Sequence, residues 1–169
     1  MLDIVQWETG KARRDALEEF LDVLVTARHY ARDAARLLRP RRQRGALPVL
    51  VGVRELHHPK GVVGIISPWN YPFAIPFSEV IMALLAGNAV ILKAASETQV
   101  VGHALKECIE AAGLPDGVFT YLNLPGSVAG DALLESGVDK LFFTGSVPVG
   151  KYLMKKASET LTPVSLELG

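Results

Sequence analysis

The sequence lacks the features that define several large classes of protein. It has one cysteine in 169 residues, which excludes an internal disulfide and fits a reducing, cytoplasmic setting. Its apolar runs stay well short of the roughly 18 residues that a membrane-spanning helix needs. The opening stretch, MLDIVQWETGKARRDALEEF, is charged and has no apolar segment typical of a signal peptide. We therefore expect a cytoplasmic protein that does not insert into a membrane.

Metal-binding and dinucleotide-binding signatures are also missing. His57 and His58 are adjacent in an extended segment and should point to opposite sides, and His29 and His103 have no ligand partner nearby in sequence. The usual G-x-G-x-x-G fingerprint occurs nowhere in the chain. We expect no metal site, and any dinucleotide would have to be held in another way.

Charge is balanced overall but unevenly distributed. Residues 1–60 hold 12 Lys/Arg against 8 Asp/Glu, and five of the arginines lie in RLLRPRRQR, residues 36–44. Such a cluster could meet phosphate or an acidic membrane. No aromatic side chains interleave with it for base stacking, and a solvated helix end followed by a loop also explains it. We expect no nucleic-acid partner.

The apolar pattern divides the chain into two parts. In residues 1–60 it predicts a helix over 15–38, ended by Pro40, and an extended segment over 47–56. The buried stripe of that helix is expected to be Leu17, Phe20, Leu21, Leu24, Ala27, Ala31, Ala35 and Leu38. Residues 61–169 alternate between short apolar runs and helical segments.

The alternation predicts an α/β fold with a doubly wound, mostly parallel sheet, because the apolar runs are continuous rather than alternating. The expected strands are 61–67, 88–93, 117–123, 138–145 and 162–168, and the expected helices are 78–87, 96–113, 128–136 and 147–158. Ligands of such sheets bind beyond the carboxyl ends of the strands, so those ends should carry the function.

Polar residues follow these strands. Asn70 lies in a stiff loop between Pro68 and Pro72 and could present its amide to an oxyanion; alternatively it caps a turn and Trp69 is core. Lys93 precedes a helix start with a capping box at Ser96 and could form an anion site, or its side chain could extend to solvent.

The last two expected strands also end in candidate functional residues. Gly145 and Ser146 lead directly into a helix whose free N–H groups could hold a phosphate, or Ser146 is simply an N-cap. Glu167 ends the final strand, where poor solvation would raise its pKa towards that of a general base; alternatively it pairs with a lysine.

These stretches, in this order, resemble the aldehyde dehydrogenase superfamily. SPWNYPFAIPFSEVIMALLAGNAVILK is similar to its Pro-Trp-Asn loop, helix and lysine-ending strand, DKLFFTGSVPVGK to its phosphate-binding turn, and SLELG to the start of its Glu-Leu-Gly-Gly-Lys motif. The resemblance runs from about residue 9 to residue 169. It implies NAD(P)+-dependent oxidation of a small-molecule aldehyde to a carboxylic acid through a cysteine thioester.

The resemblance also implies roles by position. Asn70 would be the oxyanion amide and Glu167 the general base. The implied cofactor-binding residues are Ile66, Ser67, Pro68, Trp69, Asn70, Lys93, Ser96, Gly126, Gly130, Phe143, Thr144, Gly145, Ser146, Val149 and Leu168. Residues 46–58 would belong to an oligomerisation element of a homo-dimer or tetramer, which gives an N-terminal part, 1–60, and a dinucleotide-binding domain, 61–169.

The cofactor could be NAD or NADP. Ser96 stands where NAD-preferring members often keep a glutamate for the ribose hydroxyls. A small neutral residue there leaves room for a 2'-phosphate beside Lys93 and suggests tolerance of NADP, although Glu97 is adjacent.

The family's nucleophilic cysteine would lie beyond residue 169, so we expect these residues alone to be inactive. Cys108, with Leu105, Ile109 and Ala112 as apolar neighbours, is expected in the core. Two other functions stay open. One is an acylating, CoA-dependent member or acyl-phosphate reductase, against which Glu167 argues; the other is a non-catalytic nucleotide-binding module.

Overall fold

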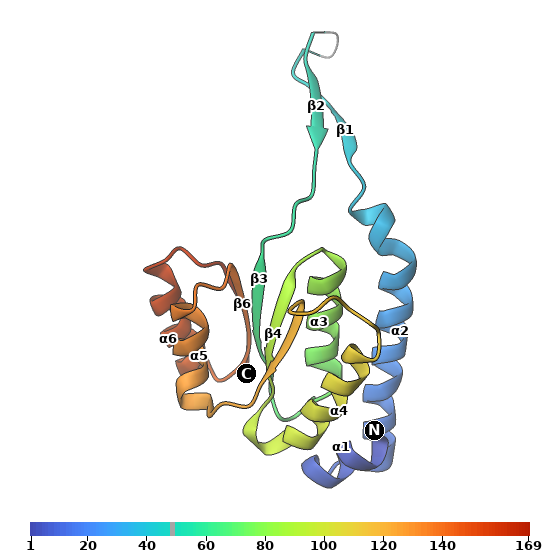
Figure 1. The fold of residues 1–169 in the computed structure, drawn as a ribbon, viewed down its shortest axis with the longest axis vertical. Helices are drawn as coiled ribbons and strands as arrows, with labels where there is room; N and C mark the ends of the chain where they lie inside the picture. The colour runs from blue at the N-terminus through green and yellow to red at the C-terminus, as the bar shows by residue number, and fades with distance from the viewer. Residues whose placement is uncertain (48–49) are drawn as a thin grey trace.

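The computed structural model describes residues 1–47 and 50–169 and has a parallel sheet at its centre (Figure 1). The strands of this sheet lie in the order β5-β4-β3-β6-β7, and every neighbouring pair is parallel. Their bounds are β3, Val62–Ile66; β4, Ala89–Lys93; β5, Phe119–Leu122; β6, Lys140–Gly145; and β7, Val164–Leu168. The predicted doubly wound α/β fold is confirmed.

Helices cover both faces of the sheet. Their bounds are α1, Leu2–Thr9; α2, Arg13–Leu37; α3, Ala74–Leu85; α4, Gln99–Glu110; α5, Gly126–Glu135; and α6, Val147–Ser158. Alternate strand residues divide the core in two: Val63, Ile65, Val90 and Leu92 pack with α1–α4, whereas Ile66, Leu141 and Phe143 pack with α5 and α6. The continuous apolar strands that the sequence showed are explained by this double covering.

A two-stranded antiparallel hairpin projects from this body (Figure 1). It consists of β1, Arg41–Arg44, and β2, Gly52–Glu55, and all of its strand residues are exposed. The sequence predicted a loop where β1 lies. The expected extended segment over 47–56 includes β2, while its residues 48 and 49 lie outside the described part of the chain.

The buried face of α2 differs from the prediction. Leu17, Leu21 and Leu24 are 42%, 49% and 50% exposed over the described residues, whereas Ala16, Glu19 and Val23 are buried. Glu19 explains the difference, because its carboxylate accepts hydrogen bonds from the backbone N–H groups of Phe73 and Ala74 at the start of α3. These bonds hold the Glu19 face inward.

Within the described residues, no helix is both long enough and apolar enough to cross a membrane. The first helix, α1, was not predicted. It packs against α2 and against the start of α4, so the N-terminal residues form part of the main core rather than a separate layer.

Candidate functional site

The parallel register brings the predicted site residues to one edge of the sheet. Ile66 at the end of β3 lies beside Lys93 of β4 and Phe143 of β6. One strand further along, Thr144 pairs with Glu167 and Gly145 with Leu168. The loops that follow these strands therefore share the carboxyl edge, and a cavity opens on each face of it.

The narrower cavity, of about 150 Å³, lies between α5 and α6. Five residues that the sequence singled out line it: Ile66, Gly126, Gly130, Phe143 and Val149. Gly130 is needed for the close approach of the two helices, because a Cβ there would collide with the Leu153 side chain. The lining of this cavity is mostly apolar, which would suit an aromatic ring system.

Sequence reasoning missed the other residues of the narrow cavity, which are Ser127, Asp131, Tyr152 and Leu153. The hydroxyl of Tyr152 donates to Asp131 Oδ1 at 2.8 Å, and Lys156 Nζ lies 2.9 Å from the same oxygen. These contacts tie α6 to α5. Residue spacing within either helix carries no signal for them, since they depend on how the two helices pack.

Lys93 is buried, with 4% of its surface exposed, so its side chain does not extend to solvent. Burial lowers the pKa of its ammonium group, an effect that the nearby charge of Glu97 partly opposes. Its Nζ lies 3.8 Å from the point where a Cβ on Gly126 would stand. The lysine therefore places its charge near the start of α5, beside the narrow cavity.

The capping box predicted at Ser96 is wrong. Ser96 lies in a short 3₁₀ turn, η1, Ser96–Thr98, which has no side-chain cap hydrogen bond. The N–H groups of Val100 and Val101 instead donate to the two carboxylate oxygens of Glu8, at 2.9 and 2.7 Å. A carboxylate from α1 thus occupies this helix start, which argues against the anion site expected there.

Gln99, the expected partner in that box, has a different role. Its side-chain NH2 donates to the carbonyl of Ala95 at 2.7 Å, and its Oε1 accepts from the hydroxyl of Tyr121 at 2.8 Å. Ser96 itself is exposed. It lies three residues after Lys93, on the same loop at the carboxyl edge.

The start of α6 fits the anion-binding hypothesis better. Ser146 is exposed, has extended backbone angles (φ −72°, ψ 149°) and makes no side-chain cap hydrogen bond, so the simple N-cap alternative is not observed. A Cβ at Gly145 would come within 2.6 Å of the Phe143 ring, so a side chain there would have to displace that ring. Uncapped N–H groups at a helix start favour an anion.

The loop after β3 holds the predicted oxyanion amide. Ser67 and Pro68 are buried, and the Ser67 N–H donates to the carbonyl of Lys93 at 3.1 Å. Trp69 is 56% exposed, so the alternative that places it in the core is wrong. Asn70 is exposed at the tip of this loop, where its amide is accessible to a ligand.

The wider cavity, of about 520 Å³, lies on the other face, between α3 and the β6–β7 edge. Its described lining is Asp22, Tyr71, Ala74, Ile75, Ser78, Glu79, Met82, Phe142, Ser165 and Glu167. The predicted general base therefore lies in a cavity that the residue next to Asn70 also lines. Glu167 is exposed, so these residues do not supply the desolvation expected at the strand end.

Glu79 is the functional candidate that the sequence reasoning overlooked. It is 8% exposed, and burial raises the pKa of its carboxyl to about 8, with the charge of Glu167 adding to the effect. Its Oε2 has no hydrogen-bond partner among the described residues. A single charged residue in the apolar stretch AIPFSEVIMALL was the available signal.

Cys108 is exposed, which corrects the prediction that it belongs to the core. The buried stripe of α4 is Val101, Leu105 and Ile109. Cys108 is adjacent to Ile109 in sequence, but successive helix residues are about 100° apart around the axis, so it lies off the stripe. In the described part of the chain, no three or more His, Cys, Asp or Glu side chains are placed so that they could hold a metal ion together.

Comparison with known proteins fits these features. Residues 1–169 match the model of the aldehyde dehydrogenase family. The chain belongs to the aldehyde dehydrogenase family. It is 48% identical over 169 residues to a Mycolicibacterium smegmatis protein provisionally named succinate-semialdehyde dehydrogenase (NADP+), and 37% identical over 173 residues to a Methylomonas 4,4'-diapolycopene aldehyde oxidase. Each alignment covers all of this chain and 32% of the relative.

Solved structures of related enzymes have the same fold. The NAD-dependent aldehyde dehydrogenase from Sinorhizobium meliloti aligns with a TM-score of 0.91 and 37% identity, over 99% of this chain and 33% of that one. An NADP-dependent enzyme from E. coli aligns with a TM-score of 0.91 and 31% identity, over 99% and 35%. This aldehyde dehydrogenase chain thus spans about a third of the proteins that it matches.

Proposed function

We propose that the protein containing this chain oxidises an aldehyde to a carboxylic acid, with NAD+ or NADP+ as the hydride acceptor. The observation that supports this best is the pair of cavities at the carboxyl edge. A narrow apolar cavity lies on one face, and a wider one that contains Glu167 lies on the other. The Asn70 loop follows β3, the middle strand of the sheet, and its Tyr71 lines the wider cavity.

The residues present fit a dinucleotide. The narrow cavity would take the adenine ring, lined by Val149 and Ile66. Lys93 would contact the ribose region, and the uncapped start of α6 at Gly145 and Ser146 would hold the pyrophosphate. Ser67, Pro68, Trp69, Thr144 and Leu168 lie along the same edge and would line the remaining part. The bound nicotinamide supplies the hydride acceptor.

On the side of the wider cavity, residues of this chain would bind the oxyanion of the substrate and activate the hydrolytic water. Asn70 would donate its amide N–H to the oxyanion that forms when the aldehyde carbonyl is attacked, a contribution worth about 3–4 kcal/mol in well-studied oxyanion holes. Glu167 would accept a proton from the water that hydrolyses the acyl intermediate. Because an acylating enzyme needs no such base, Glu167 supports hydrolysis over transfer to CoA.

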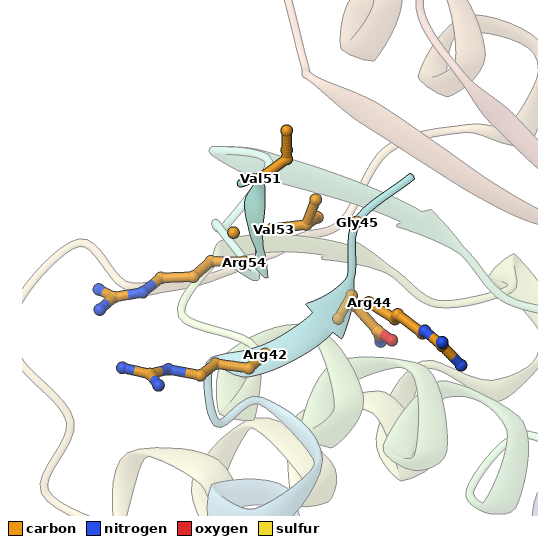
Figure 2. Close-up of a pocket in the computed structure, with 8 residues that line it drawn as sticks. Arg42, Arg44, Gly45, Val51, Val53 and Arg54 are labelled. Carbon is orange, nitrogen blue, oxygen red and sulfur yellow. The ribbon is translucent and has the colours of Figure 1, made fainter. Parts of the chain in front are cut away.

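The exposed hairpin supports a homo-oligomer. An isolated two-stranded hairpin is marginally stable in water, and here Arg42 lies directly opposite Arg54, a like-charge pair that is destabilising. Figure 2 shows these two side chains projecting to the same side of the hairpin, where a hollow is lined by both arginines and by Val51 and Val53. This hollow, of about 670 Å³, lies away from the carboxyl edge. We propose that the hairpin packs on another copy of the protein.

The test uses the protein purified from its complete coding sequence. We expect it to reduce NAD+ or NADP+ only when an aldehyde is added, and to release a free carboxylic acid. Asn70→Ala and Glu167→Gln should each lower kcat at least a hundredfold while dinucleotide binding, followed by fluorescence, persists. Formation of an acyl-CoA only when CoA is supplied would contradict hydrolysis, and dinucleotide binding with no aldehyde oxidation would indicate a binding module.

A further inference from the structure

The buried acid Glu79 has no role in the mechanism described so far. It is the one charged residue of α3, and a carboxylate in such surroundings is costly unless it is paired or neutral. It is 8% exposed and its Oε2 lacks a hydrogen-bond partner among the described residues. An orphaned oxygen on a buried acid calls for a ligand, a water or a proton.

The cavity that Glu79 lines has no cationic side chain among its described lining residues. Three carboxylates line its cavity, those of Asp22 from α2, Glu79 and Glu167 from β7, together with the hydroxyl of Tyr71. No Lys, Arg or His is part of the described lining. The nearby Lys140 of β6 donates to Ser165 Oγ at 2.8 Å, and burial together with Lys60 lowers its pKa. We therefore expect a proton, rather than a counter-ion, to neutralise Glu79.

We propose that Glu79 is a proton-holding partner of Glu167, a neutral carboxylic acid that exchanges a proton with the Glu167 carboxylate through water in their shared cavity. The cavity of about 520 Å³ has room for such water, given about 30 Å³ per molecule in the liquid. The proposal rests on the hydrolytic function of Glu167 argued above.

The proton balance is simple. As the hydrolytic water attacks, its O–H bond breaks, its oxygen bonds to the acyl carbon, and Glu167 gains the proton; the carbon–sulfur bond breaks and leaves its electron pair on sulfur as a thiolate. Glu167 then passes this proton through water to the carboxyl group of Glu79, which releases its own proton to solvent. Glu167 is restored as a carboxylate, and Glu79 stays neutral throughout.

The decisive variant is Glu79→Gln, which keeps the size and neutrality of the acid but cannot exchange a proton. In the protein from the complete coding sequence, we expect kcat at pH 7 to fall about tenfold with KM within about twofold. This loss is smaller than the 10²–10⁴-fold due to a group that transfers the proton directly. Glu79→Asp, which keeps a carboxyl group, should recover part of the loss. Glu107→Gln, which changes an exposed carboxylate on α4, is the matched control and should leave kcat unchanged.

An infrared titration gives a readout that does not depend on turnover. We expect a protonated-carboxyl band at pH 7 that disappears with a midpoint of about 8 and is absent from Glu79→Gln. Lack of this band in the wild type would show that Glu79 is ionised, and would overturn the proposal even in an active enzyme. A band without any change in kcat or its pH profile on Glu79→Gln would also overturn it. Absence of all aldehyde oxidation, by contrast, would refute the proposed function itself.

Discussion

The carboxylate of Glu19, on α2, accepts a hydrogen bond from the backbone N–H of Phe73 at 2.7 Å and a second from Ala74 at 3.0 Å. These N–H groups begin α3, directly after the loop that holds Asn70. Lys11 pairs with the same carboxylate at 2.8 Å, and its Nζ also lies 3.8 Å from the centre of the Tyr71 ring. The N-terminal helices therefore fix the position of the loop that holds Asn70, more than fifty residues away.

Glu19→Ala should release this loop. It removes two hydrogen bonds to a charged acceptor and leaves Lys11 without its partner, so we expect the free energy of unfolding to fall by about 2–4 kcal/mol. The matched control is Glu18→Ala, whose pairing with Arg14 is exposed and should change stability by less than about 1 kcal/mol. Urea unfolding followed by circular dichroism measures both. Equal effects of the two variants would contradict a specific clamp at Glu19.

The predictions from sequence succeeded where periodicity decided the outcome. The strands and helices after residue 61 were found in the right order because continuous apolar runs and helical stripes are local patterns. They failed where a distant group intervened. The face of α2 is set by the contacts of Glu19 with α3, and the start of α4 is capped by Glu8, so neither could be read from neighbouring residues.

In the candidate site, too, local motifs were predictable from the sequence and contacts between distant residues were not. The family resemblance pointed to Ile66, Gly126, Gly130, Phe143 and Val149, which line one cavity. Asp131 and Tyr152 were missed because they meet only when α5 packs against α6. Glu79 was missed because its significance lies in its burial and in the company of Glu167, neither of which follows from its place in the sequence.

Ser96 provides a test of cofactor choice. Its side chain is exposed beside the Lys93 loop, where a 2'-phosphate would meet a neutral hydroxyl rather than a carboxylate. We expect the wild-type protein to bind both NAD+ and NADP+, and Ser96→Glu to weaken NADP+ binding at least tenfold, about 1.4 kcal/mol, with little effect on NAD+. Fluorescence titration of the complete protein measures both constants. Strong wild-type discrimination in favour of NAD+ would contradict this role.

Cys108 should be reactive but dispensable. Because its thiol is exposed on α4, we expect it to react with a maleimide in the native 169-residue chain at a rate close to that in urea. The same chain should not oxidise aldehydes, since the cysteine that the resemblance implies is a different one. Turnover by this chain that Cys108→Ala abolishes would contradict the prediction and assign the nucleophile to α4.

Glu79 should also make stability depend on pH in an unusual direction. Its carboxyl keeps a proton up to about pH 8 in the native state, whereas an unperturbed glutamate releases it near 4.5. Between these values the unfolded state binds fewer protons, so the free energy of unfolding should fall as pH rises, by roughly 3–5 kcal/mol across the window. Below pH 4.5 the Glu79 carboxyl is protonated in both the native and the unfolded state, so this group no longer makes stability depend on pH.

Urea unfolding of the 169-residue chain at a series of pH values isolates this effect when wild type and Glu79→Gln are compared. The variant has no titrating group at this position, so it should be more stable than wild type at pH 8 and should differ little at pH 4. Glu107→Gln should follow the wild-type curve, because its carboxylate is exposed in the native state. A constant difference between wild type and Glu79→Gln at all pH values would mean that Glu79 is ionised in the folded protein, and that the apolar surroundings of α3 do not hold its proton.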